Sequence, residues 1–443
     1  MTTTEGTSHS ITEIAALVQP DRVHRAVYTD PDIFEIELRR LWGTAWIYVG
    51  HESQIPSTGD YTTSEIARQP VILVRHSDGS ARVLFNRCAH KGAEVVTERS
   101  GNAKYFYCNY HGWTYRTDGT LANLPLRKGY EGTCFSMTDP QFSLQPVPRV
   151  ESYRGFVFAS LAASGPDLRT FLGPSLEAFD DMCDRSPEGE VEVMGTCART
   201  IQHSNWKFFM ENQLDVIHAG IVHLSSAQAA RKVAAEHFEK GAKQPFGLVM
   251  LQAQVAPDPD SFWEKLLSNN FRYGHSNFLG YQPSRGDDPV TLEYEEQLRK
   301  KVGKEKAEKF LSRNFHHTVV YPCLSVQSSF QQLRVVKPLA VDRTLMEIWH
   351  FRLKGVSKAF TARNLTYANI VNTPGTIISC DDYETWWRCH EGLKSQGGDW
   401  VSIHRNAGGD LIDGDIVRSR VGSSEVFQRN QYAAWQAYMT EEV

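Results

Sequence analysis

Two short segments of this 443-residue chain, "CAHKG" and "CNYHGW", each carry one cysteine and one histidine a few positions apart. Written out, the pattern is Cys88-x-His90, seventeen residues, then Cys108-x-x-His111. The flanking sequences "PVILVRH", "ARVLFNR" and "KYFYC" are rich in β-branched and aromatic residues. A Ser-Asp-Gly turn separates the first two, and another Asp-Gly turn follows "WTYRT" after the second Cys/His pair, which is typical of hairpins. We therefore predict that each Cys/His pair lies at the tip of a β-hairpin.

Three interpretations of this pattern compete. A structural zinc site uses the same residue types, but usually with two cysteines in one knuckle, and here no two cysteines share a loop. The residues could also be core thiols with incidental histidines. In a Rieske [2Fe–2S] centre two cysteines hold one iron and two histidines hold the other. One cysteine and one histidine from each loop favour that third interpretation.

A second histidine motif lies in "NWKFFMENQLDVIHAGIVH", which an apolar stripe predicts to be a buried helix. His218 and His223 are five residues apart, about 140° around an ideal helix, so both can face one metal only if the helix breaks. Gly220 between them is the expected break. Asp215 is expected to share a helix face with His218.

Two histidines and one carboxylate form the facial triad of non-haem Fe(II) oxygenases. The segment "SCDDYETWWRCHEGL" is predicted to be a helix with Asp381, Asp382 and Glu384 near its start, and it is the best source of that carboxylate. Acidic residues at a helix N-terminus also occur simply because they complement the helix dipole.

Together the motifs resemble those of the large (alpha) subunit of Rieske non-haem iron ring-hydroxylating oxygenases. The resemblance covers essentially the whole chain, and the "EGL…GGDW" stretch and final helix are most similar to the benzoate-type branch. It implies that Cys88, His90, Cys108 and His111 hold a [2Fe–2S] cluster. It implies that His218, His223 and Asp382, with Asp381 as the alternative, hold a mononuclear Fe(II). Asp215 matches the acid that joins the two metal sites.

The resemblance also implies an α+β fold, in which an antiparallel β Rieske domain is inserted into an α+β catalytic domain with a central antiparallel, helix-grip (START-like) sheet. We expect an N-terminal helical part at 1–43, the Rieske domain at 44–163 and the catalytic domain at 164–443. Asp30 and Pro31 are the expected N-cap and first residue of the N-terminal helix. Residues 225–313 are expected to be a helical lid over the substrate channel or a solvated scaffold.

The activity implied is that of a terminal oxygenase component that uses O₂ to hydroxylate, and more specifically to cis-dihydroxylate, an aromatic carboxylic acid. No Gly-x-Gly-x-x-Gly or P-loop motif occurs, so an NAD(P)H-dependent reductase, with or without a ferredoxin, is expected to supply electrons. Arg334 in "QLRVVKP" is a candidate for binding the substrate carboxylate, or else an edge-strand arginine in solvent. Two alternatives remain: a Rieske monooxygenase (a demethylase or monohydroxylase) and a Rieske electron carrier.

The family forms head-to-tail trimers, alone or with a small beta subunit, in which the cluster of one subunit faces the iron of the next. Asp215 would then accept hydrogen bonds from His218 and from His111 of a neighbouring copy. The net charge of −5 and the lack of a basic run argue against nucleic acid as a partner. No apolar stretch is long enough to span a bilayer, and the polar N-terminus does not look like a signal peptide, so we expect a cytoplasmic protein.

Overall fold

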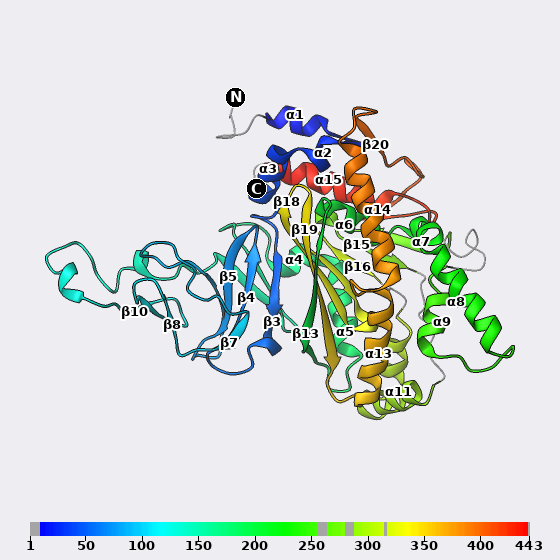
Figure 1. The fold of residues 1–443 in the computed structure, drawn as a ribbon, viewed down its shortest axis with the longest axis horizontal. Coiled ribbons are helices and arrows are strands. Elements are labelled where there is room, and N and C mark those ends of the chain that lie inside the picture. Colours follow the sequence, from blue (N-terminus) through cyan, green and yellow to red (C-terminus); the bar gives the residue numbers. More distant parts are fainter. Residues whose placement is uncertain (1–8, 256–263, 280–287, 314–316, 442–443) are drawn as a thin grey trace. The chain divides into compact units, whose positions relative to one another are not determined.

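The computed structural model describes residues 9–255, 264–279, 288–313 and 317–441. The chain divides into a larger unit, residues 1–41 and 169–443, and an inserted unit, residues 42–168. The sequence-based boundaries at 43/44 and 163/164 lie a few residues away. Figure 1 draws the inserted unit in blue to blue-green, and in the sequence this unit interrupts the larger one.

A nine-stranded antiparallel sheet forms the centre of the larger unit, which confirms the expected α+β class with a central antiparallel sheet. A separate three-stranded sheet of β1 (Val18–Gln19), β2 (Arg22–His24) and β20 (Trp400–Ser402) joins the two ends of the chain. The nine strands, in their order across the sheet, are β13 (Val191–Gln202), β19 (Arg343–Leu353), β18 (Gln332–Ala340), β17 (Leu324–Gln327), β16 (Thr318–Val320), β15 (Ser276–Leu279), β14 (Leu267–Asn270), β22 (Ile416–Arg418) and β21 (Leu411–Asp413).

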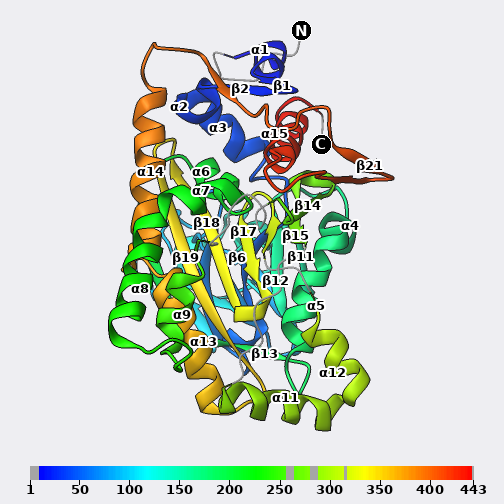
Figure 2. The same cartoon turned by 90° about the vertical axis from the view of Figure 1, so that its right-hand side faces the viewer.

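Helices pack around this sheet, and Figures 1 and 2 both show α8, α9, α13 and α14 grouped along one side of it. The N-terminal and C-terminal helices lie together at one end in Figure 2. The described helices are α1 (Ile11–Ala16), α2 (Ala26–Thr29), α3 (Pro31–Arg40), α4 (Leu168–Leu172), α5 (Leu176–Asp184), α6 (Trp206–Asn212), α7 (Val216–Val222), α8 (Leu224–His237), α9 (Phe246–Gln252), α11 (Pro289–Val302), α12 (Lys304–Leu311), α13 (Lys358–Val371), α14 (Ile377–Leu393) and α15 (Val426–Thr440).

The start of α3 agrees with the capping signal in the sequence. Asp30 is the N-cap, its carboxylate accepts the backbone N–H groups of Asp32 and Ile33, and Pro31 occupies the first turn. Farther along α3, the fully buried Glu37 accepts the indole N–H groups of Trp206 on α6 and Trp435 on α15. The two ends of the chain are therefore tied to the helix that leads into the second histidine motif.

The region from 225 to 313 is only partly the helical cover that the sequence suggests. Helices α8, α9, α11 and α12 are present, but β14 and β15 lie between them and belong to the central sheet. These two short strands, with the sequences LSNN and SNFL, show no alternation of polar and apolar residues, so the sequence pattern does not predict them. Residues 256–263 and 280–287 of this segment lie outside the described residues.

The inserted unit consists of antiparallel strands with a buried cluster of aromatic and aliphatic side chains between them. One sheet has the order β6 (Ala81–Phe85), β5 (Gln69–Arg75), β4 (Asp60–Ile66) and β7 (Ser100–Asn102). A second has the order β10 (Leu121–Asn123), β9 (Thr114–Arg116) and β8 (Tyr105–Tyr107). A third has the order β11 (Arg149–Tyr153), β12 (Phe156–Ser160) and β3 (Ile47–His51).

One local expectation about the Cys/His loops is wrong. Cys108 and His111 do lie in the hairpin loop between β8 and β9, which pair directly. Cys88 and His90 instead lie in the connection from β6 to β7, which are opposite edges of one four-stranded sheet. The hairpin signal before Cys88 belongs to the turn between β5 and β6 and says nothing about the strand that follows the loop.

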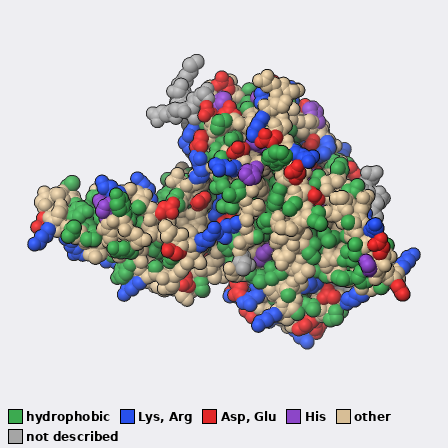
Figure 3. Space-filling view, in the orientation of Figure 1, with side chains coloured by type: hydrophobic (Ala, Val, Ile, Leu, Met, Phe, Trp, Pro, Cys, Tyr) green, Lys and Arg blue, Asp and Glu red, His purple; other side chains and the backbone are tan. Residues whose placement is uncertain are grey.

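The face drawn in Figure 3 carries lysine and arginine side chains interspersed with aspartate and glutamate. Among the described residues of that face, no basic stripe of the kind that binds nucleic acid stands out. Within the described part of the chain, no helix combines the length and the apolar character needed to cross a membrane.

Candidate metal centres and the adjoining cavity

The two Cys/His loops of the inserted unit have the same backbone turn. In each loop the cysteine N–H donates to the carbonyl five residues later, at 2.8 Å for both Cys88 and Cys108. In each loop a glycine four residues after the cysteine, Gly92 or Gly112, donates back to the cysteine carbonyl at 2.9 Å. These glycines have φ of +79° and +71°, a region that disfavours side chains. Glycine at this place therefore shapes both loops.

The turns bring the four side chains together in pairs of like kind. Cys88 and Cys108 are 2% and 1% exposed, and their thiols lie within hydrogen-bonding reach of each other. The ring centroids of His90 and His111 are 4.6 Å apart, and His90 stacks on Trp113 with centroids at 5.1 Å. Two sulfur donors thus lie side by side, as do two imidazoles, which is the segregation that a Rieske cluster requires.

The local electrostatics fit a cationic group held by these side chains. Burial raises the pKa of the Cys88 thiol, whose Sγ lies 3.1 Å from the hydroxyl of Tyr115. Burial lowers the pKa of His90, which favours the neutral imidazole that can bind a metal. Its Nδ1 is buried without a hydrogen-bond partner among the described residues. A [2Fe–2S] cluster would supply both the positive charge for the thiolates and the missing partner for the nitrogen.

The second histidine motif is broken into three helices in a way that differs from the expectation. Helix α6 ends at Asn212, and Asp215 begins α7 as its N-cap by accepting the backbone N–H groups of Ile217 and His218. Gly220 lies inside α7, whereas the break falls at His223, between α7 and α8. His223 has φ −95° and ψ 8°, which turns its side chain back toward α7.

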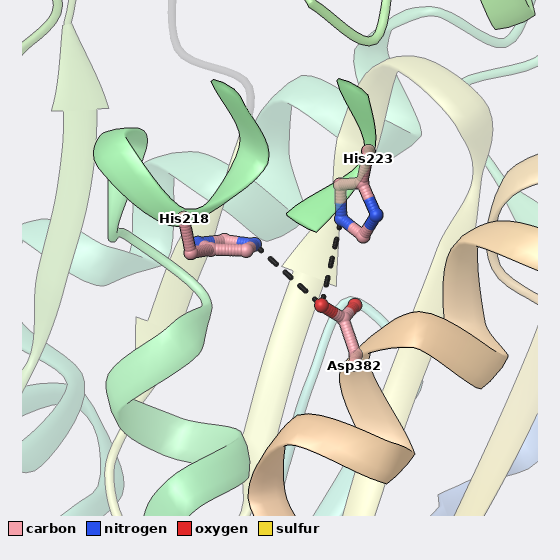
Figure 4. A group of neighbouring side chains, drawn as sticks. All are labelled: His218, His223 and Asp382. Atoms are coloured by element: carbon pink, nitrogen blue, oxygen red, sulfur yellow. Dashed lines mark ion pairs between the residues drawn. The ribbon is translucent and has the colours of Figure 1, made fainter. Parts of the chain in front are cut away.

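His218, His223 and Asp382 converge on one point. Asp382 Oδ1 lies 3.7 Å from His218 Nε2 and 3.4 Å from His223 Nε2. Figure 4 shows the two imidazoles, from α7 and from its junction with α8, pointing at the carboxylate on α14. One donor atom from each residue lies within 4.8 Å of the others, a spacing that suits three ligands at about 2.1 Å from one ion.

This group is costly to bury without a cation. Burial raises the pKa of Asp382 to about 6, although the nearby His218 opposes the shift. Burial, followed by the charge of His218, lowers the pKa of His223 to about 4. Neutral imidazoles and a carboxylate that lacks a full counter-charge are the donor set of a non-haem iron site, so these residues fit the iron.

The three acidic residues in the first half of α14 have different places. Asp382 faces both histidines, whereas Asp381 Oδ2 lies 3.5 Å from His223 Nδ1, on the far side of the same ring. Glu384 is exposed and pairs with Arg388 at 2.9 Å, so it takes no part in the group. Asp381 is thus suited to orient an imidazole whose other nitrogen binds metal.

Asp215 lies beside this group but does not hydrogen-bond to His218. Its Oδ1 is 4.0 Å from His218 Nδ1, which is beyond hydrogen-bonding distance. Its Oδ2 lies 3.5 Å from Arg405, which also pairs with Glu425 at 3.2 Å. In this chain on its own, Asp215 is therefore an N-cap with a neighbouring cation.

A cavity of about 150 Å³ opens onto the histidine–aspartate group. A cavity of this order holds a benzene-sized molecule. Its wall combines apolar residues with amides, imidazoles and one arginine, and the described lining residues are Asn212, Gln213, Asp215, Val216, His218, Ala219, His223, Ala253, Gln254, Leu266, Phe278, His317, Gln327, Arg334, Val371, Asn372, Ile378 and Asp382.

Arg334 belongs to this wall rather than to a solvent-exposed edge, because β18 is an inner strand of the sheet. Its Nη2 lies 3.4 Å from Ser325 Oγ, and its guanidinium lies 5.4 Å from the ring centroid of Phe209. Its charge also lowers the pKa of Asp382, after burial has raised it.

Sequence reasoning missed several residues of the cavity and its surroundings. His317, Gln327 and Asn372 come from separate elements, and none belongs to a motif. Arg405 reaches Asp215 from a segment 190 positions later in the chain. Nothing in the sequence alone indicates these contacts, although the strand pattern around Ser325 and Gln327 does place both on one face.

The comparisons with known proteins agree with this geometry. Residues 45–148 match the Rieske [2Fe-2S] domain family, and residues 192–441 match the catalytic domain of ring-hydroxylating alpha subunits. Toluate 1,2-dioxygenase subunit alpha from Pseudomonas putida is 32% identical over 87% of this chain and 83% of its own length. The 2-halobenzoate 1,2-dioxygenase large subunit from Burkholderia cepacia is 30% identical over 87% of this chain and 80% of its own.

Solved structures share the fold at lower identity. A naphthalene 1,2-dioxygenase with indole bound in its active site has a TM-score of 0.80 and 24% identity, and covers 96% of this chain and 94% of that one. A quaternary ammonium Rieske monooxygenase has a TM-score of 0.66 and 20% identity over 96% and 97% of the two chains. The catalytic-domain match spans more than half of the chain. The chain therefore belongs to the ring-hydroxylating oxygenase alpha subunits, a dioxygenase family with a Rieske [2Fe–2S] cluster and a mononuclear iron.

Proposed function

We propose that this chain is a terminal oxygenase component that cis-dihydroxylates the ring of an aromatic carboxylic acid. One observation carries the proposal. The cavity that adjoins His218, His223 and Asp382 has room for one aromatic ring, and the guanidinium of Arg334 lies in its wall. The relatives named for toluate and 2-halobenzoate support an acid as the substrate.

In this proposal Cys88, His90, Cys108 and His111 hold the cluster, and His218, His223 and Asp382 hold the iron. When bound, the cluster supplies single electrons and the iron, with coordination positions left open, supplies the site for O₂ chemistry. The 3.4 and 3.7 Å separations favour Asp382 over Asp381 as the third ligand.

The remaining side chains position and shield this site. Asp381 Oδ2 lies 3.5 Å from His223 Nδ1 without a hydrogen bond in this structure, and in the proposal its charge orients the ring so that Nε2 faces Asp382. Val371 and Ile378 belong to the apolar part of the wall, which a ring can cover more favourably than water can. Arg334 offers the substrate carboxylate two parallel N–H donors.

Electrons must come from another protein, and we assign that role to an NAD(P)H-dependent reductase with or without a ferredoxin. We further propose a homotrimer, or a trimer with a small beta subunit, in which Asp215 lies between the iron of its own subunit and the cluster of the next. The exposed position of His111 and the partial exposure of Asp215 leave both side chains accessible to another subunit.

The test is coupled O₂ uptake with the native reductase on benzoate, salicylate, anthranilate and phthalate isomers, followed by product analysis under ¹⁸O₂. We expect a cis-dihydrodiol that carries both atoms of one O₂ molecule. A phenol or a demethylated product with one labelled atom would assign the chain to monooxygenase chemistry. Uptake on naphthalene or biphenyl, but on none of the acids, would remove the assigned role of Arg334.

A further inference from the structure

The cavity wall has a second polar region besides Arg334, and strand register fixes its place. Ser325 and Gln327 on β17 are two residues apart and so face the same side of the sheet. Their cross-strand partners on β18 are Arg334 and Gln332, respectively. Because Arg334 Nη2 lies 3.4 Å from Ser325 Oγ, the cation lies at the level of Ser325.

Gln327 joins two further cavity residues in a neutral cluster. His317 Nδ1 donates to the backbone carbonyl of Gln213 at 3.1 Å, so its Nε2 carries a lone pair. The amide nitrogen of Gln327 donates to that lone pair, and the amide oxygen of Gln327 accepts from Asn372 Nδ2 at 2.8 Å. We call His317, Gln327 and Asn372 the amide cluster.

The amide cluster has hydrogen-bonding capacity left over. The amide of Asn372 has two N–H groups and an oxygen, and in the described part of the chain only one of its N–H groups is used by a side chain. Beside Gln327, the side chain of Gln332 is fully buried, and neither its oxygen nor its nitrogen has a partner among the described residues. Gln332 does not itself line the cavity, so the hydrogen-bonding capacity that a ligand could meet there is what remains on Gln327 and Asn372.

The spacing between the two polar regions matches a substituted ring. Two residues along a strand span about 6.6 Å. Measured along β17, that distance separates the Arg334–Ser325 pair from Gln327. It is comparable with the separation of substituents on opposite sides of a benzene ring, and it is too long for neighbouring ring positions.

We propose that the cavity selects aromatic acids that carry a neutral hydrogen-bonding substituent, such as hydroxyl or amino, meta or para to the carboxylate. This inference rests on the proposed function: Arg334 binds the carboxylate and the amide cluster binds the second substituent. A methyl group in that position would leave the remaining N–H capacity of Gln327 and Asn372 without a partner on the substrate. A second carboxylate would be a buried charge without a cation.

The experiment is calorimetric titration of the iron- and cluster-loaded enzyme, without O₂, with benzoate, 3- and 4-hydroxybenzoate, 4-methylbenzoate and terephthalate. We expect the better of the two hydroxybenzoates to bind about tenfold more tightly than 4-methylbenzoate, and terephthalate to bind least. Gln327→Met should reduce this preference to less than twofold.

Two further variants complete the design. Asn372→Ala removes the other amide, leaves β17 intact and should also abolish the preference, which keeps the test valid if Gln327→Met does not fold. Gln202→Met replaces a buried glutamine of β13, outside the cavity lining, and should retain the preference.

Equal binding of hydroxy- and methylbenzoates by the wild-type enzyme would overturn the inference, as would a preference that survives both cluster variants. These outcomes leave the proposed function standing. If no benzoate binds, or if Arg334→Leu binds benzoate as well as the wild-type enzyme does, the proposed aromatic-acid specificity fails, and this inference fails with it.

Discussion

The two metal centres of this chain are assembled in opposite ways. The four cluster donors lie within 24 residues, on two loops that repeat one glycine-containing turn. The iron group joins two histidines at a helix break to Asp382, which lies 159 residues later in the chain. A site encoded locally depends on its own turns, whereas a site assembled from distant segments depends on how the whole domain packs.

The largest effect is expected where the local site loses one donor. Cys108→Ser should abolish the visible and electron paramagnetic resonance signals of the cluster, because each cluster iron needs its full ligand set, and turnover should fall to background. Mononuclear iron should remain bound. Cys134→Ser, at an exposed cysteine of the same unit, is the control and should match the wild type. A wild-type protein that is colourless and carries stoichiometric zinc would show that the two Cys/His loops hold no [2Fe–2S] cluster, which would contradict the comparison of the two centres.

Substitutions in the iron site, which is assembled from distant segments, should have the opposite effect on metal content. Asp382→Ala should lose mononuclear iron and turnover while the cluster spectrum stays intact, because the two centres share no donor. Asp381→Ala should retain iron and lose about 10- to 100-fold in activity, the usual effect of removing a carboxylate that orients a ligand. The iron content and turnover of the two variants show which aspartate is the iron ligand. The reverse result would make Asp381 the ligand.

Variants of Asp215 test whether electron transfer between the two centres depends on this residue. Asp215→Asn preserves the N-cap of α7 but removes the charge, whereas Asp215→Ala also removes the cap, at about 1 kcal/mol of stability. Both variants should keep cluster colour and bound iron, yet fail to oxidise a pre-reduced cluster during a single turnover with substrate and O₂. Wild-type reoxidation and product yield would remove the role, and a monomer in solution would remove the inter-subunit scheme.

The same contrast explains what could be predicted from the sequence. The proposed cluster ligands Cys88 and His90 stand in a local pattern, and only the strand that follows their loop differs from the expectation, because pairing of β7 with β4 is a long-range contact. The break in the second motif was expected at Gly220 but falls at His223. A glycine permits a break, whereas packing and the Asp215 cap determine where the helices begin.

Residues that act through tertiary contacts left no signal in the sequence. Arg405 meets Asp215, and Asn372 meets Gln327, only because the domain folds as it does. Arg334 was a candidate for binding a carboxylate because its strand was expected to wall the pocket, and Arg334 does line the cavity. The chemistry of a centre can therefore be predicted from its motif, whereas the selectivity of its pocket requires the fold.

Arg334 allows the pocket to be tested separately from the metal. Arg334→Leu should raise the KM for benzoate roughly 10- to 150-fold, equivalent to about 1.5–3 kcal/mol for a lost charged hydrogen bond. Iron content should not change, because Arg334 is not among the three donors. Arg352→Leu, at a half-exposed arginine of the neighbouring strand, should leave KM unaltered. An unchanged KM in Arg334→Leu rejects the carboxylate-binding role.

The smallest effect on activity is expected from Glu211 on α6, which lies outside the group of His218, His223 and Asp382. Burial raises its pKa to about 7, while the hydroxyls of Tyr432 and Tyr28 and the charge of Lys207 act in the opposite direction and Glu425 adds to the shift. The folded state holds this proton more tightly than the unfolded state does. The stability contributed by Glu211 is therefore present at low pH and is lost as pH rises from about 4.5 to 7.

Glu211→Gln, which keeps the shape of the side chain but cannot ionise, should remove this pH dependence from the unfolding of the larger unit. Urea unfolding at pH 5 and pH 8 measures it, and the loss of stability between the two pH values should be smaller in the variant than in the wild type by an amount on the order of a few kcal/mol. The spectroscopic signal of the [2Fe–2S] cluster should change with urea concentration in the same way in the wild type and in Glu211→Gln. An equal pH dependence in wild type and variant would show that Glu211 is ionised throughout.

Iron and acid-labile sulfide per chain in the purified enzyme test the central claim most directly. One chain that holds a [2Fe–2S] cluster and a separate mononuclear iron should contain three irons and two sulfides. His223→Ala should contain two irons and the same two sulfides. Two irons in the wild type, unchanged in His223→Ala, would describe an electron carrier and would contradict the account of a second centre built from His218, His223 and Asp382.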